Sequence, residues 1–146
     1  MNRTISVADL ERLGACETQV FMFSLIFPEA DNGVEVTVEN VRKALKAGLS
    51  LHWLGQAIFT TPAYVEYKRV LDAAWAEYLS VERPAWVEYR RVAGPRWEYP
   101  HATLLSAIAE YGRIEKAVGE KYHLAEAMAW VAAYEASVDV AGKGDE

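Results

Sequence analysis

The sequence has one cysteine and no excess of basic residues, and each shortage excludes a class of protein. A single cysteine, Cys16, cannot form an internal disulfide or supply a multi-cysteine zinc site. The chain has 15 lysines and arginines against 21 aspartates and glutamates, a formal net charge of -6. Proteins that bind mainly through phosphate contacts need clustered positive charge. Direct nucleic-acid binding is therefore not expected.

Long apolar runs are also missing. The longest, residues 20–27, is far shorter than the roughly twenty residues of a transmembrane helix. It has neither the basic leader nor the small-residue cleavage site of a signal peptide. We therefore expect a buried helix that ends before Pro28, no membrane contact and a cytoplasmic protein.

Catalytic and metal-binding motifs are absent from the sequence. The histidines His52, His101 and His123 share no metal-ligand spacing with each other or with Cys16. We expect Cys16 to be a small buried residue, because no histidine that could activate its thiol lies nearby in sequence. The sequence predicts no catalytic residue, no metal and no cofactor, and we expect a protein that is not an enzyme.

The most distinctive feature is a repeat with a period of eleven residues. The pattern Ala-x-x-Glu-Tyr-x-x-Val begins at Ala63, Ala74 and Ala85. Fainter copies occur at 96–99, 109–111 and 120–122. Eleven residues make three helical turns at about 3.67 residues per turn, so equivalent positions return to nearly the same helix face. The pattern predicts helices with a continuous apolar and aromatic stripe.

The tyrosines and tryptophans of the repeat lie on different parts of that stripe. Each tyrosine follows the repeat alanine by four residues and shares its face. The tryptophans of the later copies follow the alanine by one residue, about 100° around the helix. We expect the tyrosine column to face the core and part of the tryptophan column to reach the surface. The alternative is that all these rings are buried in the core and pack against other helices.

Prolines and glycines predict where the helices begin and end. Pro62, Pro84 and Pro95 fall at corresponding places, and a proline inside a helix costs about 3 kcal/mol. We expect a helix from Pro62 to about residue 83, a break, a short helix over 85–93 and a second break at Pro95. A long helix should run from about residue 101 toward 137, with Gly119 as a candidate interruption.

These patterns together predict an all-α fold: an irregular multi-helix bundle with the repeat in its middle. At most a minimal extended pair is expected near 34–36. One helical domain should span 1–140, composed of an N-terminal helical segment (1–61) and a repeat-derived segment (62–140). We expect 141–146 to be a disordered tail.

Two stretches resemble small proteins of unknown function encoded by bacteriophages and prophages. The N-terminal stretch has Gly14-Ala15-Cys16, Phe27-Pro28 and Val34-Glu35-Val36-Thr37, and tandem Ala-x-x-Glu-Tyr-x-x-Val units follow. The resemblance covers about 4–47 and 63–92. It implies a phage origin and a bacterial host cytoplasm, and it implies no activity. This chain departs from the simple repeat by its tryptophans and by losing the pattern after Val92.

We expect a non-enzymatic binding protein that covers a surface of a host protein or protein–nucleic-acid complex. An inhibitor of a host defence complex, such as an anti-CRISPR protein, is the most specific version. The alternatives are a structural protein that forms homo-oligomers and, third, a module that binds single-stranded nucleic acid. The candidate partner-binding residues are Trp75, Trp86, Trp97, Arg90, Arg91, Glu110 and Glu115.

Overall fold

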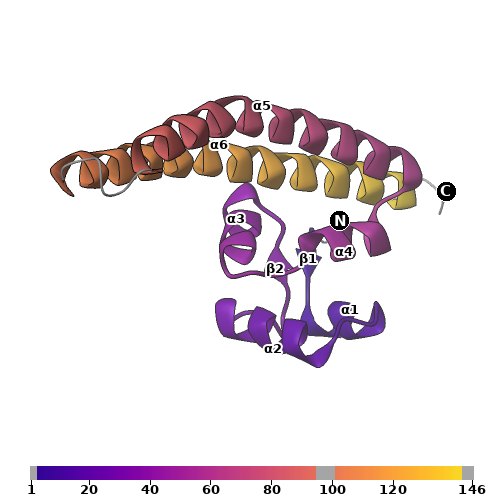
Figure 1. Cartoon of the computed structure of the whole chain (residues 1–146). Helices are drawn as coiled ribbons and strands as arrows, with labels where there is room; N and C mark the ends of the chain where they lie inside the picture. The colour runs from indigo at the N-terminus through magenta and orange to yellow at the C-terminus, as the bar shows by residue number, and fades with distance from the viewer. Residues whose placement is uncertain (1–2, 95–100, 143–146) are drawn as a thin grey trace. The chain divides into compact units, whose positions relative to one another are not determined.

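The computed structural model describes residues 3–94 and 101–142, and within them the fold is mainly α as predicted (Figure 1). In chain order the elements are β1 (Thr4–Ile5), α1 (Val7–Arg12), α2 (Glu17–Ile26), β2 (Val34–Glu35), α3 (Val38–Lys46), α4 (Leu51–Ile58), α5 (Thr61–Ala93) and α6 (His101–Gly142). β1 and β2 form a two-stranded antiparallel sheet, with Thr4 opposite Glu35 and Ile5 opposite Val34. This is the minimal extended pair expected near 34–36, and its partner strand is β1.

The chain divides into two compact units. The core unit consists of Met1–Leu71 and Leu124–Glu146, and the hairpin unit is Asp72–His123. The two long helices, α5 and α6, contribute residues to both units. The single helical domain predicted over 1–140 stays a prediction.

Side-chain caps begin two helices of the core unit. The Asp9 amide donates to Ser6 Oγ (3.2 Å), and the Ser6 amide donates to Asp9 Oδ2 (2.9 Å), which completes a capping box before α1. Hydrogen bonds from the Ser6 amide and hydroxyl hold the pKa of Asp9 below its ordinary value of 3.8. Thr37 Oγ1 accepts a hydrogen bond from the Asn40 amide (3.2 Å) and caps α3 in the same way.

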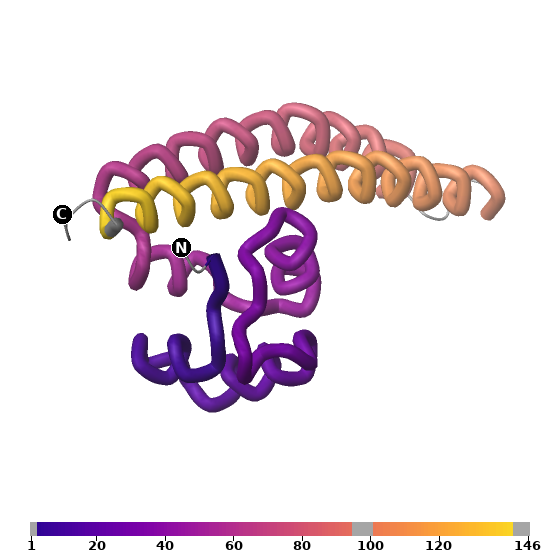
Figure 2. The backbone as a smooth tube through the Cα atoms, turned by 180° about the vertical axis from the view of Figure 1, so that it is seen from behind, coloured from indigo at the N-terminus to yellow at the C-terminus, as the bar shows by residue number. Residues whose placement is uncertain are grey.

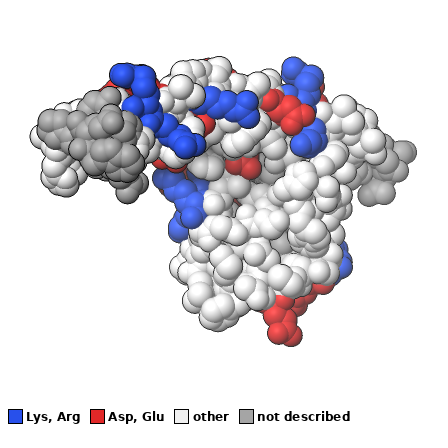
Figure 3. Space-filling model, viewed as in Figure 1, with Lys and Arg blue, Asp and Glu red and all other residues white. Residues whose placement is uncertain are grey.

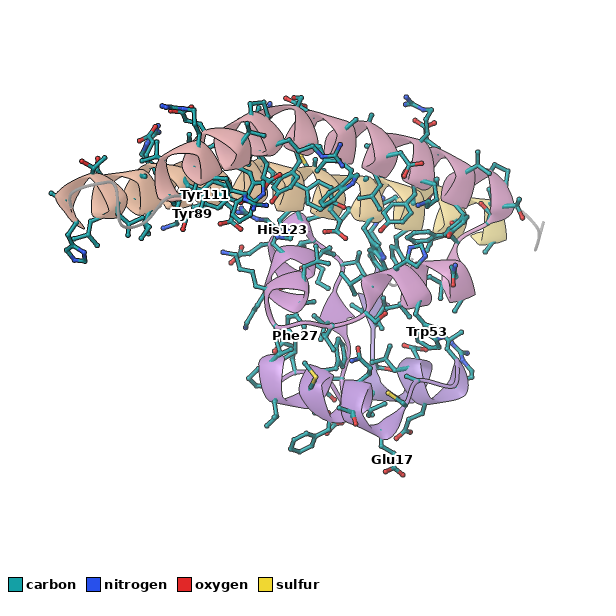
Figure 4. The ribbon with its side chains drawn as sticks, in the orientation of Figure 1. Glu17, Phe27, Trp53, Tyr89, Tyr111 and His123 are labelled. Atoms are coloured by element: carbon teal, nitrogen blue, oxygen red, sulfur yellow. The ribbon has the colours of Figure 1, made fainter. Side chains whose placement is uncertain are left out.

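Aromatic side chains join the elements of the core unit. The largest fully buried side chains are Phe27, Tyr67 and Trp130. The Phe59 ring lies 5.6 Å from that of Tyr67 and 5.1 Å from that of Trp130, between α5 and α6. Trp130 Nε1 donates to the Leu51 carbonyl (2.9 Å) and ties α6 to α4. In Figure 4, Phe27 lies beside the end of α2 and Glu17 at the outer edge of the same helix.

Two predictions of burial near α2 are wrong. Phe23 and Phe27 are buried, but Phe21 and Leu25 are 64% and 67% exposed, so the helix is covered on one face only. Cys16, expected to be buried, is exposed. It occupies the N-cap of α2 and makes no side-chain capping hydrogen bond. An apolar run indicates a helix in the protein but does not say how many neighbours cover that helix.

The predicted break at Pro84 is also wrong. α5 continues through this residue from Thr61 to Ala93, as Figure 1 shows. A proline costs about 3 kcal/mol in a helix interior, but α5 packs against α6 on both sides of it, which offsets that cost. α5 ends at Ala93, which agrees with the predicted second break. Pro95 itself lies outside the described residues.

α6 continues beyond the predicted limits. It passes Gly119 without interruption and extends to Gly142, so the first two residues of the expected tail are helical. Residues 143–146 lie outside the described part of the chain. In that described part, no helix has a stretch long and apolar enough to cross a membrane.

Candidate protein-binding surface

Ring contacts fix the register of α5 against α6 in the hairpin unit. The ring centroids of Tyr78 and Tyr122 lie 6.0 Å apart, and those of Tyr89 and Tyr111 lie 5.4 Å apart. A step of eleven residues forward on α5 is therefore a step of eleven residues back on α6. Helices related in this way run antiparallel, and Figure 2 shows them side by side.

The first of two repeated aromatic clusters combines Trp75 and Tyr78 of α5 with Tyr122 of α6. The Trp75 and Tyr78 rings are stacked, with centroids 4.9 Å apart and planes inclined by 11°. Tyr122 meets the Trp75 ring edge-on at 5.4 Å. Stacked and edge-to-face rings each contribute about 0.5–1.5 kcal/mol beyond the area they bury. We call this cluster the first rung.

The second rung consists of Trp86, Tyr89 and Tyr111 and repeats the first one. Trp86 stacks on Tyr89 with centroids 5.4 Å apart and contacts Tyr111 at the same distance. Figure 4 shows Tyr89 and Tyr111 next to each other between the two helices. The Arg90 guanidinium lies 5.9 Å from the centre of the Trp86 ring, in cation–π contact. The two rungs, eleven residues apart, are separated by about 16 Å along α5.

The expected split between tyrosines and tryptophans is confirmed. Trp75 and Trp86 are 46% and 41% exposed, whereas Tyr78 and Tyr89 are half-buried. Tyr67, the equivalent tyrosine in the core unit, is only 1% exposed. The tryptophans of the two rungs therefore present part of their rings to solvent while their other contacts hold them in place. We call the two rungs together the aromatic ladder.

Two carboxylates lie close to the tyrosines of the ladder. Tyr111 Oη donates to Glu82 Oε1 (2.8 Å). Burial, this hydrogen bond and the charges of Glu82 and Glu115 raise the pKa of Tyr111 to about 12. Burial also raises the pKa of Tyr78, and the same two carboxylates add to the shift. The ladder thus combines exposed indole rings with negative charge.

Ion pairs line the flanks of the hairpin. Glu77 pairs with Lys121 across the two helices. Two further pairs, Glu88–Arg91 (2.6 Å) and Glu110–Arg113 (2.7 Å), each join residues three positions apart on one helix. Side chains of both charges lie along the long helices in Figure 3. Exposed pairs of this kind contribute about 0–1 kcal/mol each, so they affect recognition more than stability.

The candidate residues fall into three groups in the structure. Trp75, Trp86 and Arg90 come together at the ladder. Arg91 and Glu110 belong to the flanking ion pairs, and Glu115 acts on the ladder tyrosines through its charge. The seventh candidate, Trp97, lies outside the described residues.

Two ladder tyrosines and one carboxylate beside the ladder were missed by the sequence prediction. Tyr111, Tyr122 and Glu82 complete the rungs from the α6 side or join them to it. A signal for the two tyrosines was present, because both occur in faint copies of the repeat. In an antiparallel hairpin such copies would face the tyrosines of α5, which marks both residues as candidates without fixing which tyrosine each one contacts.

Of the three histidines, His52 lies in the core unit, whereas His101 and His123 belong to the hairpin unit. His52 is exposed, and its Nε2 lies 3.3 Å from Gln56 Nε2 and 3.5 Å from Tyr64 Oη. Among the described residues, no three His, Cys, Asp or Glu side chains form a group that could hold a metal ion. Comparison with protein families, curated proteins and solved structures found no match to this chain.

Proposed function

We propose that this is a non-enzymatic, phage- or prophage-encoded protein that binds a host protein or protein–nucleic-acid complex through its aromatic ladder. The observation that carries the proposal is the exposure of Trp75 and Trp86, each fixed by stacking on a tyrosine three residues later. The partial resemblance of the sequence to phage proteins supports the origin. The proposed mode of action is occlusion of the partner's surface.

The geometry of the rungs favours binding because the tryptophans are held before a partner arrives. Ordering a mobile side chain on binding costs about 0.5–1.5 kcal/mol. The rings of Trp75 and Trp86 each contact tyrosines of both helices, so much of this ordering is complete in the free protein. Tryptophan and tyrosine are also enriched among the residues that dominate binding energy at protein interfaces.

The charge beside the ladder indicates which partner surface would fit. Glu82 and Glu115 lie near the ladder tyrosines, and the whole chain has a net charge of -6. A basic surface would be complementary in charge, and its arginines could stack on the indole rings. The nucleic-acid-binding groove of a host defence complex has this chemistry, so we propose an anti-CRISPR-like inhibitor as the specific form of this function.

The experiment compares three forms of the full chain. Wild type is crosslinked in host lysate, the captured protein is identified, and its affinity is then measured with purified components. Trp75→Ala/Trp86→Ala should weaken that affinity by at least about 30-fold, equivalent to roughly 2 kcal/mol, as at an interface hot spot. Val87→Ala is the matched control, because Val87 is a 66% exposed apolar residue of the same unit outside the rungs.

Two results would contradict the proposal. The first is a double tryptophan variant that binds the identified partner as tightly as wild type, which would place the contact elsewhere. The second is capture of nucleic acid alone, with a strong decrease in affinity at high salt, which would favour the single-stranded nucleic-acid alternative.

A further inference from the structure

A groove runs between α5 and α6 in the hairpin unit. Tyr89 and Tyr111 of the second rung line it, whereas Trp75 and Trp86 do not. The volume of the groove is about 600 Å³. Small and aliphatic side chains form much of its lining, among them Ala85, Val92, Ala102 and Ala107. Small residues allow another helix to approach to the 8–10 Å axial distance of close helix packing. The groove is therefore shaped to receive a helix.

The hairpin unit buries few of its own side chains. Among its described residues, Ala93 is the one apolar residue that is buried, whereas Phe27, Tyr67 and Trp130 of the core unit are almost completely enclosed. Two helices can cover only the seam between them, and helical bundles close their core with further helices. A helix pair packed into the groove would complete that burial.

The charges of the groove favour a partner that carries both signs. Glu88 lies eleven residues after Glu77 on α5, and Glu110 lies eleven residues before Lys121 on α6. The position equivalent to the Glu77–Lys121 pair therefore holds two carboxylates, and both line the groove. Each is paired with an arginine on its own helix, Arg91 or Arg113. A purely basic partner would face these arginines, and a purely acidic partner would face the carboxylates.

We propose that the occupant of this groove is the hairpin of a second copy of the chain. The two hairpins together would form a four-helix bundle. Around a two-fold axis each copy would present its glutamates to the arginines of the other, as an isologous interface requires. This inference uses neither Trp75 nor Trp86, so it stands or fails separately from the proposed function. It leaves the exposed tryptophan faces for a different partner.

The test exchanges the charges at the groove in two variants of the full chain. Glu88→Arg/Glu110→Arg makes the four charged positions basic, and Arg91→Glu/Arg113→Glu makes them acidic. Sedimentation equilibrium should show a wild-type dimer and an association constant at least about tenfold lower for each variant alone. An equimolar mixture of the two should restore a dimer with one copy of each.

Two further variants complete the experiment. Glu66→Arg is the matched control, because Glu66 pairs with Arg69 at the same position of the repeat but lies in the core unit, and this variant should stay dimeric. Ser106→Trp places a large ring in the groove without changing its charges and should also prevent dimerisation. A wild-type monomer at all concentrations would overturn the proposal. So would a dimer that survives Ser106→Trp and both charge exchanges, or a mixture of the two charge variants that remains monomeric.

Discussion

Replacing either of two glycines of α6 with alanine should stabilise the protein. Gly112 and Gly119 lie inside the continuous helix, and a Cβ added at either position meets no atom within 4 Å. Glycine is about 0.8–1.0 kcal/mol less favourable than alanine in a helix interior, because it loses more backbone entropy on folding. No clash opposes that gain. Each substitution should therefore increase the free energy of unfolding of this helix by close to 1 kcal/mol.

The double variant gives a larger and sharper signal. The two sites lie seven residues apart, about 10 Å along the axis, so their effects should add to roughly 2 kcal/mol. Chemical unfolding of the full chain, followed by circular dichroism and tryptophan fluorescence, measures the change. The free energies of unfolding of wild type and variant are compared provided that the slope of free energy against denaturant concentration is the same for both.

Gly14 provides a control with the opposite expected sign. A Cβ at this position also meets nothing within 4 Å, but its φ of +83° lies in the left-handed region. Gly14→Ala should therefore destabilise the core unit by about 1 kcal/mol or more. If Gly112→Ala and Gly119→Ala were destabilising instead, α6 would not be the continuous helix with open space at these positions that the reasoning requires.

Four further outcomes follow from other residues. Tyr67→Ala should lower the free energy of unfolding by about 3–5 kcal/mol in thermal or chemical unfolding, because its ring is almost completely buried. The lowered pKa of Asp9 means that its carboxylate stabilises the fold above pH 3.8, and this contribution is lost as the pH falls through the lowered pKa. In unfolding measured against pH, the free energy of unfolding of Asp9→Asn should therefore decrease less at acid pH than that of wild type. Glu82→Gln should lower the pKa of Tyr111 from about 12, because it removes a negative charge while burial remains, and phenolate absorbance during alkaline titration measures it. Cys16 should react with an alkylating reagent in the native protein about as fast as in denaturant, whereas strong native protection would contradict its exposure.

Features determined by nearby residues were predictable from the sequence. The capping box of Ser6 and Asp9 and the cap at Thr37 involve residues three positions apart, so the sequence contains both partners side by side. The eleven-residue period likewise indicated that Trp75 and Trp86 would be more exposed than the adjoining tyrosines. These features depend only on the geometry of one helix.

Features that depend on distant packing were not predictable in the same way. Whether Pro84 breaks α5 depends on contacts with α6, and the exposure of Phe21 depends on which elements cover α2. The same holds for the rungs. The pairing of Tyr78 with Tyr122 follows only from the place where the chain reverses, and a periodic sequence is compatible with several such places.

The antiparallel pairing of the repeats on α5 and α6 has a consequence for how the length of the hairpin can change. Inserting one complete eleven-residue unit into each helix would add another rung and extend the hairpin by about 16 Å. The faces of all existing residues would be preserved, because each insertion is three whole turns. Duplication of short coding segments could therefore adjust the reach of the hairpin stepwise, while the buried residues of the core unit remain unchanged.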